Sequence, residues 1–372
     1  MLPIQPPFIP AFFSFFASER KLKSTAQNHN EQFYLSWEDA LWHLLQIHKI
    51  KKDAIILVPE FFCGDVIDNM ESHGLKHINY KVDKYLQPNV SDFIQKLQKE
   101  KPMLVVIFHA VGITNPLLQN TKKWLQFLPK NSILIEDCVH KVIDPQKIEF
   151  ITKNHYIIDS LRKVVPLQGS WLYSKQPTSK TTRQTNFLTA WYRFLVFFWW
   201  VLMQLFLVAV FYTKNSTIQK QGNKLAEFAM RQGYEVIGDH KLSACGFSGM
   251  AWLSRKLNYK KIYENKVEQV QLYKKLLTPL FKQQQTLISK YFFEIPFLDL
   301  DYSQLRGFPL GINLEFAESF LQTIRSKNLL LRFELNDGAW SNNQKIVYLP
   351  MGLHVKNKDI EWVCRVIVSY NN

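Results

Sequence analysis

The sequence contains few cysteines, and none of them are spaced to bind a metal. Four occur among 372 residues, at positions 63, 138, 245 and 364, and they lie far apart. Zinc and iron–sulfur sites need closely paired ligands, so we expect no metal centre. Disulfide-rich secreted scaffolds are excluded as well, and we expect reduced, mostly buried thiols in a reducing compartment.

The sequence also lacks a recognisable export signal. Residues 1–7 (MLPIQPP) have neither the basic start nor the continuous apolar core of a secretion signal. The apolar residues 12–16 are too few to provide one. We therefore expect a cytoplasmic protein.

The strongly basic composition is not accompanied by a nucleic-acid-binding signature. The net charge is +15, but the lysines are spread along the chain, and no zinc-finger or RNA-binding motif occurs. We therefore expect no nucleic acid partner. Phosphorylated substrates and the anionic face of a membrane remain as candidate partners for the charge.

One carboxylate and one lysine are the most informative pair of residues. Asp137 closes the apolar run 133–137, and Lys163 comes shortly after a second apolar run, 155–159. In open α/β sheets ligands bind outside the carboxyl ends of the strands, so both side chains should project into one crevice. Pyridoxal phosphate (PLP) needs such a pair, with the amine forming a Schiff base and the carboxylate holding a proton on the ring nitrogen. A helix-capping aspartate and a solvated lysine are the plainer alternative.

Short apolar runs alternate with segments of helical periodicity over residues 53–174. Strands are expected at 55–58, 77–80, 104–108, 133–137 and 155–159, and helices at 37–47, 61–73, 90–99 and 120–127. Uniformly apolar strands separated by helices predict a parallel sheet that is covered on both faces.

The pattern changes after residue 220. Helices are expected near 223–231, 258–277, 315–327 and 357–369, with strands at 308–312 and 345–349. This is an α+β unit, so we place a domain boundary within 215–250 and predict a large domain, 1–245, and a small domain, 246–372.

The segment 187–212 is almost entirely aliphatic or aromatic and contains neither glycine nor proline. It is long enough to cross a bilayer, which takes about 20 residues. Three arrangements are compatible with it: a helix lying in the membrane interface, a helix buried at a subunit contact, or a true span that divides the domains. Its tryptophans and tyrosine suit a membrane interface.

Several short motifs occur in a fixed order. They are DAIILVPEF at 53–61, the stretch 73–83 that ends in YKVD, IEDCVH at 135–140, the lysine segment 160–169 that ends in glycine, and VYLPMGL at 347–353 followed by Asp359 and Ile360. From about residue 31 onward the chain resembles the DegT/StrS-type sugar aminotransferases. These are PLP-dependent enzymes of the aspartate aminotransferase fold, fold type I. The resemblance implies an α/β fold with a mostly parallel large-domain sheet and a smaller C-terminal α+β domain, here with an inserted apolar helix.

The resemblance also implies roles for single residues. Lys163 would form the Schiff base with the coenzyme and move the proton of the substrate. Asp137 would pair with the pyridinium nitrogen, and His140 would lie beside the ring hydroxyl. Ser160 would donate to the phosphate. The enzymes of this family are expected to work as homodimers.

Three parts of the family pattern are missing or altered. One is the Gly-Tyr-Asn-Tyr-Arg element, which in the family lends a group to the neighbouring subunit's site and has no clear counterpart in this chain. Where the family has a Ser-Gly-Thr turn for the phosphate, this chain has Ser36, followed by Trp37, Glu38 and Asp39. Ser36 is the expected cap of the helix 37–47 and, by its position, a candidate coenzyme-binding residue. That turn lacks a glycine and carries two carboxylates at a helix start that would otherwise favour an anion. Cys63 stands where the family has the aromatic residue that stacks on the coenzyme ring. Phe61 or Phe62 could take that role, and Phe62 is the candidate coenzyme-binding residue.

Two function classes follow. In the first, the protein moves an amino group from an amino-acid donor to a keto-sugar nucleotide or related polysaccharide precursor. The apolar segment 187–212 would then hold it at the inner face of the membrane. In the second, it is a catalytically impaired protein on the same scaffold that acts as a membrane-associated binding partner. The Asp137/Lys163 pair favours the first class, and the altered phosphate turn favours the second.

Overall fold

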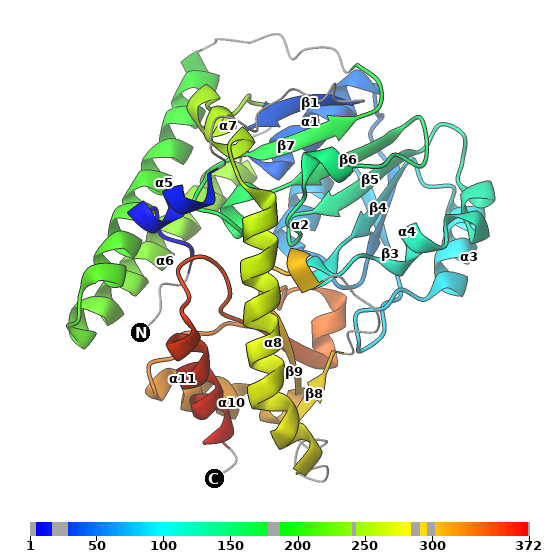
Figure 1. The fold of residues 1–372 in the computed structure, drawn as a ribbon. Helices are drawn as coiled ribbons and strands as arrows, with labels where there is room; N and C mark the ends of the chain where they lie inside the picture. The colour runs from blue at the N-terminus through cyan, green and yellow to red at the C-terminus, as the bar shows by residue number, and fades with distance from the viewer. Residues whose placement is uncertain are drawn as a thin grey trace.

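A seven-stranded sheet with helices around it forms the larger of the two structural units (Figure 1). The computed structural model describes residues 5–16, 29–177, 187–239, 243–283, 291–295 and 302–370. The sheet order is β1-β7-β6-β5-β4-β2-β3. Its strands are β1 Asn30–Tyr34, β2 Ile55–Pro59, β3 Lys76–Tyr80, β4 Leu104–Phe108, β5 Ile133–Cys138, β6 His155–Asp159 and β7 Ser170–Ser174.

The predicted parallel sheet is confirmed for its central strands. β3, β2, β4, β5 and β6 run parallel, whereas β7 and β1 add an antiparallel edge that the sequence had not indicated. Every residue of β4 and β5 is buried. The helices around this sheet are α1 Trp37–Ile47, α2 Gly64–Ser72, α3 Val90–Glu100 and α4 Pro116–Gln119.

The helix predicted near 120–127 is wrong. The chain forms the short helix α4 and then two 3-10 turns, Thr121–Lys123 and Leu125–Phe127. Asn115 caps α4, since its side chain accepts from the Leu117 N–H, and the Trp124 indole N–H donates to the Leu117 carbonyl at 2.8 Å. That tertiary contact folds the segment back, so the helix cannot continue.

A second, three-stranded antiparallel sheet lies at the other end of the molecule, with strand order β10-β9-β8. Its strands are β8 Phe292–Glu294, β9 Phe308–Asn313 and β10 Gln344–Leu349, and its helices are α10 Leu314–Ser326 and α11 Asn357–Val368. The long helix α8, Tyr259–Gln283, runs between the two sheets, and the short α7, Ser248–Arg255, precedes it (Figure 1). The predicted boundary after residue 245 falls just before α7 and stays a prediction.

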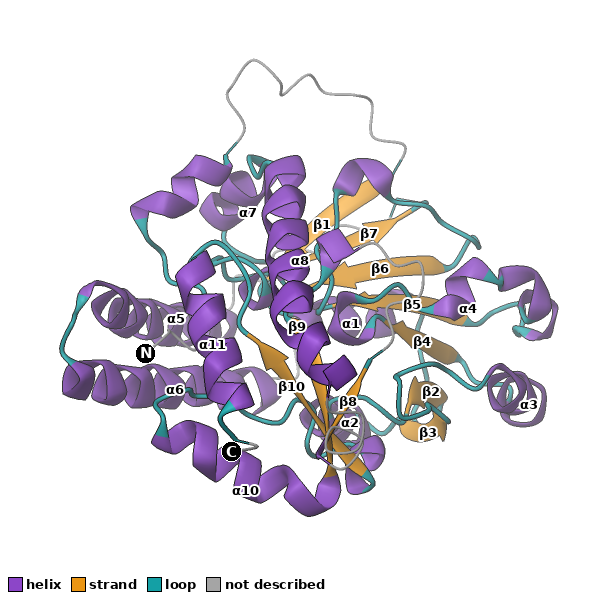
Figure 2. Ribbon diagram, turned by 60° about the horizontal axis from the view of Figure 1, so that its bottom comes forward, coloured by secondary structure: helices purple, strands orange, loops and turns teal. Residues whose placement is uncertain are grey.

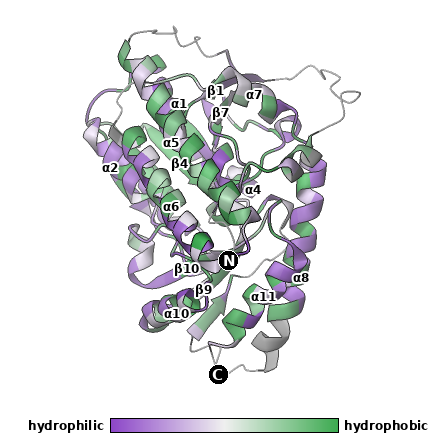
Figure 3. Ribbon diagram, turned by 90° about the vertical axis from the view of Figure 1, so that its left-hand side faces the viewer, coloured by the Kyte–Doolittle hydropathy of each residue, from purple (hydrophilic) through white to green (hydrophobic). Residues whose placement is uncertain are grey.

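Two long helices form a hairpin on one flank. α5 spans Phe187–Tyr212 and α6 spans Ser216–Asp239, and they lie side by side in Figures 1 and 2. α5 has the bounds that the sequence indicated. Among the described residues it is the one helix long and apolar enough to cross a membrane. Figure 3 colours it hydrophobic along most of its length, beside the mixed pattern of α6.

Candidate functional site

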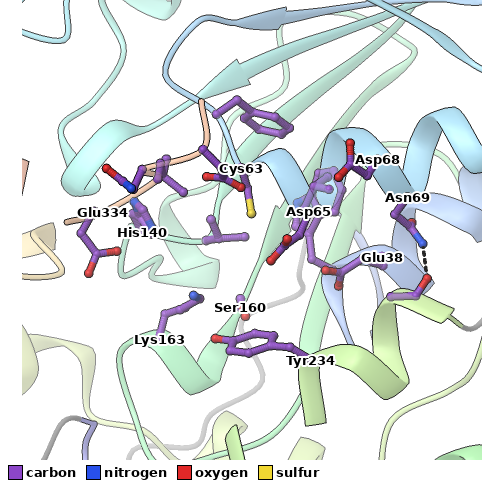
Figure 4. Close-up of a pocket in the computed structure, with 18 of the residues that line it drawn as sticks. Glu38, Cys63, Asp65, Asp68, Asn69, His140, Ser160, Lys163, Tyr234 and Glu334 are labelled. Atoms are coloured by element: carbon purple, nitrogen blue, oxygen red, sulfur yellow. Dashed lines mark hydrogen bonds between the residues drawn. The ribbon is translucent and has the colours of Figure 1, made fainter. Parts of the chain in front are cut away.

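A cavity of about 1000 Å³ opens at the carboxyl ends of the central strands. Side chains from the ends of β4, β5 and β6, from α2 and α6, and from the segment 332–337 line it (Figure 4). Asp137 and Lys163 both line this cavity, as the sequence predicted. Phe62, His140 and Ser160 line it as well.

Asp137 is a buried carboxylate at the end of β5, with an exposed fraction of 2%. One of its oxygens accepts from the Val139 N–H at 3.0 Å. In the described part of the chain it forms no ion pair. Burial raises its pKa to about 7, although the Val139 hydrogen bond and the charge of Lys163 oppose this. A cationic N–H placed against this oxygen would relieve the cost of burial.

Lys163 is held by a loop that begins where β6 ends. The Leu161 N–H donates to the Gly169 carbonyl at 3.0 Å, which closes the loop. Gly169 has φ +136°, and a Cβ there would lie 2.1 Å from the Phe33 ring. Burial lowers the pKa of Lys163, and so do Arg306, Arg332 and Arg162, while Tyr234 opposes them. A lowered pKa favours the neutral amine that attacks an aldehyde.

Tyr234 of α6 is a site residue that the sequence did not indicate. It points to the same region of the cavity as Lys163 (Figure 4). The Arg162 guanidinium lies 4.2 Å from its ring centroid and the Lys163 Nζ 5.3 Å. Burial raises the pKa of Tyr234, but the charges of Lys163, Arg162 and Arg332 outweigh it and bring the pKa to about 7. No local motif marks this tyrosine, because only the packing of α6 brings it to Lys163.

His140 is fixed by two hydrogen bonds. The Arg306 guanidinium donates to its Nε2 at 2.8 Å, so its Nδ1 carries the proton, which faces the Tyr348 hydroxyl at 3.3 Å. Burial holds the pKa of His140 well below its usual range, helped by the charges of Arg306 and Lys163. Arg306 also pairs with Glu334 at 2.9 Å. His140 is therefore a neutral, oriented side chain in the cavity wall.

The predicted ring-stacking and phosphate residues differ in their positions. Phe62 is 2% exposed and lines the cavity, and Ser160 is 5% exposed where β6 ends. Ser36 is not among the lining residues. It caps α1, where its hydroxyl accepts from the Asp39 N–H at 3.1 Å and donates to the Asp39 carboxylate at 2.7 Å.

The partial positive charge at the start of α1 is already compensated by the acidic side chains of its first turn. Asp39 is 1% exposed and also accepts from the Tyr192 hydroxyl at 3.0 Å and from the Ala244 N–H at 2.8 Å. Glu38 faces the cavity. A carboxylate in the first turn satisfies the positive end of a helix dipole. A phosphate placed here would meet negative charge, so this turn does not fit the phosphate of PLP.

Acidic side chains predominate in the cavity as a whole. Eight carboxylates and four lysine or arginine side chains line it, although the whole chain is basic. Asp65 and Glu38 lie together on the side away from His140 and Glu334 (Figure 4). Burial raises the pKa of Asp65, and the neighbouring Asp337, Asp68 and Glu38 raise it further. This side of the cavity is unfavourable for an anion.

The residues therefore fit one half of PLP. The Lys163 amine, whose pKa is lowered, suits the aldehyde of PLP. The buried Asp137 carboxylate, which forms an ion pair with no described residue, suits the ring nitrogen. The phosphate does not fit at the start of α1, the place that the family pattern gives it and where Ser36 was its candidate ligand.

A buried network lies beside the cavity floor. The atoms of His109, Glu136 and Cys138 lie within 4.8 Å of one another, a spacing that metal ligands can have. The Asn115 N–H donates to His109 Nδ1 at 3.1 Å, so His109 Nε2 carries a proton and donates it to Glu136 at 2.8 Å. The Cys138 thiol donates to the same carboxylate at 3.6 Å. Hydrogen bonds thus account for the cluster and tie the ends of β4 and β5 together.

Solved protein structures are similar to this chain in fold, although no protein-family model and no curated protein matches its sequence. Spr1654 from Streptococcus pneumoniae, described as a sugar aminotransferase, is 12% identical in its PMP form, with a TM-score of 0.62 over 100% of this chain and 99% of that one.

Two further solved structures are similar over almost the whole chain. PseC from Helicobacter pylori, an aminotransferase of pseudoaminic acid biosynthesis, is 9% identical with a TM-score of 0.60 over 98% and 97% of the two chains. A DegT/DnrJ/EryC1/StrS aminotransferase from Brucella abortus is 13% identical with a TM-score of 0.57 over 99% and 92%. At these identities the likeness concerns the fold, and it confirms the predicted fold class, that of PLP-dependent aminotransferases.

Proposed function

We propose that this protein is a PLP-dependent aminotransferase that aminates a keto-sugar nucleotide or a related polysaccharide precursor. The main support is that Asp137 and Lys163 line one cavity, in a protein that shares its fold with Spr1654 and PseC. Sugar substrates are inferred from those neighbours, whereas the homodimer is inferred from the resemblance to the fold type I family.

The roles of the residues follow from their surroundings. Bound PLP would supply an aromatic electron sink. Asp137 would hold a proton at the ring nitrogen, and an N–H⁺ donor there would offset the burial that now raises its pKa. The Lys163 amine would bind the aldehyde and then carry a proton at the substrate carbon. Phe62 would pack against the ring, and the His140 side chain, held in place by Arg306, would lie beside it.

Absorbance of the purified protein tests this proposal. PLP joined to Lys163 gives a visible yellow band, and Lys163→Ala should abolish it. Lys163→Arg, which keeps the positive charge, should abolish it too, and circular dichroism should show that both variants are folded. If protein incubated with PLP stays colourless, the catalytically impaired alternative holds instead. The acidic start of α1 is the observation that favours that alternative.

We also propose that the protein docks peripherally on the inner face of a membrane through α5. Polar Thr189 and Gln204 are buried, whereas an apolar stripe faces outward. Its members include Phe187, Leu188, Trp191, Phe194, Phe198 and Leu205, which are 45–79% exposed. This pattern is inverted relative to a soluble helix and fits a helix lying in the lipid interface.

Contacts along both halves of α5 argue against a span that divides the domains. Tyr192, in the first half, donates to Asp39 at 3.0 Å. Gln204, in the second half, accepts from the Phe8 N–H at 2.7 Å and donates to the Pro6 carbonyl at 3.3 Å. Both halves are thus attached to one protein body, which supports a helix lying flat. Burial of the same stripe at a subunit contact is the competing arrangement.

A further inference from the structure

A second cavity, of about 370 Å³, adjoins the first and has the opposite charge. Six lysine or arginine side chains and two carboxylates line it. Lys163, Glu227, Arg332 and Glu334 line both cavities. We call the second one the cationic cavity. Lys163 therefore stands between an acidic chamber and a basic one.

Few of these positive charges are neutralised. Arg306 and Arg332 share a single carboxylate, Glu334, at 2.9 and 3.6 Å. Lys220 and Lys224 of α6 are exposed and form no ion pair with any described residue. Like charges gathered in one hollow repel each other, and an anion bound among them would remove that cost.

A buried histidine supplies an independent observation. His354 lines the cationic cavity, is 6% exposed, and its Nδ1 has no hydrogen-bond partner among the described residues. Burial and the charge of Lys266 lower its pKa to about 4, so the ring is neutral at physiological pH. A buried polar atom without a partner is costly unless a ligand or water satisfies it.

The neighbouring cavity is less favourable for an anion, judged by the described residues that line it. Eight carboxylates line it, and Glu38 and Asp39 already compensate the start of α1. A phosphate that must lie near Lys163 is therefore repelled on one side and attracted on the other.

We propose that the cationic cavity is a phosphate-ester site that serves Lys163. It would take a monophosphate or diphosphate group, with Lys220, Lys224, Arg325 and Arg332 as its cations. The group could belong to the substrate, with the carbon to be aminated lying against Lys163, or to PLP itself. That the phosphate group comes from the substrate or from PLP rests on the proposed aminotransferase function, whereas phosphate binding in this cavity does not.

Calorimetric titration with inorganic diphosphate tests the site directly. The wild-type protein should bind it, with an affinity that falls as salt is added. Lys220→Ala/Lys224→Ala should weaken binding at least about tenfold, since charged hydrogen bonds are lost. Lys122→Ala/Lys123→Ala removes the same charge from exposed positions that line neither cavity, and it should leave the affinity unchanged. Equal loss in both pairs, or no binding by the wild type, overturns the proposal.

A second titration separates the sources of the phosphate. PLP and pyridoxal, which lacks the phosphate, are compared for Schiff base formation on Lys163. If Lys220→Ala/Lys224→Ala weakens PLP but not pyridoxal, the site holds the coenzyme phosphate. If the variant binds PLP and pyridoxal as tightly as the wild type does but no longer binds diphosphate, the site holds a phosphate group of the substrate. A protein that binds diphosphate but never turns yellow would keep the anion site and refute the aminotransferase proposal.

Discussion

The Nζ of Lys163 lies 5.3 Å from the ring centroid of Tyr234, a contact between the loop after β6 and the α5–α6 hairpin. The two residues are far apart in the chain, and each alters the pKa of the other. The hairpin therefore does more than cover the flank, because α6 supplies a titrating group to the cavity.

We predict that one tyrosine of the coenzyme-free protein ionises with a midpoint near pH 7. Its tyrosinate absorbance in the near ultraviolet should be missing in Tyr234→Phe. In Lys163→Ala the midpoint should rise, because Lys163 is the strongest of the charges that lower this pKa. If Tyr234→Phe leaves the neutral titration unchanged, the group has been assigned wrongly.

Replacing the buried carboxylate of Asp137 should stabilise the coenzyme-free protein and weaken coenzyme binding. The pKa of Asp137 is raised from 3.8 to about 7, so its ionisation disfavours folding. This cost grows as the pH rises from about 4 to about 7 and is constant at higher pH. Asp137→Asn should thus stabilise the coenzyme-free protein by up to about 4 kcal/mol above pH 7, with little effect near pH 4. The same change should weaken PLP binding. Thermal unfolding at the two pH values and PLP titration measure both effects.

Adding a methyl group at Gly169 should displace the loop that carries Lys163. The positive φ and the Phe33 ring both oppose a side chain there. Gly169→Ala should cost about 1–3 kcal/mol in the free energy of unfolding and slow the reaction of Lys163 with PLP. Gly249→Ala, where nothing lies within 4 Å of an added Cβ, is the matched control. Comparable losses in both variants would contradict this role for the loop.

Polar substitutions on the outer stripe of α5 should release the protein from lipid. Phe194→Ser/Leu205→Ser alters side chains that are 53% and 62% exposed, so the fold should be kept. Binding to vesicles containing anionic lipid should fall about tenfold or more, because each large apolar side chain contributes roughly 1.5–3 kcal/mol when buried. If vesicle binding persists while a dimer dissociates, α5 is a subunit contact.

The sequence indicated the site through local patterns. The apolar runs that became β5 and β6 are continuous, so their ends, and with them Asp137 and Lys163, could be placed at one edge of the sheet. Ser36 was placed correctly as the cap of α1, but its assignment to the phosphate was not supported. The Ser36 hydroxyl donates to the Asp39 carboxylate, three residues further along the chain. That carboxylate is in turn held by Tyr192 and by the segment before α7, which are remote in sequence.

The amino-acid sequence by itself determined the order of the central parallel strands and of most helices, the fold class, and the presence of an acid and a lysine at the ends of neighbouring strands. Hydrophobic periodicity and strand ends are local properties of the chain. Only the tertiary structure decided which charges surround Lys163. Tyr234, Arg306 and Arg332 come from segments remote from one another, and electrostatic energies depend on distances in space that the order of residues does not contain.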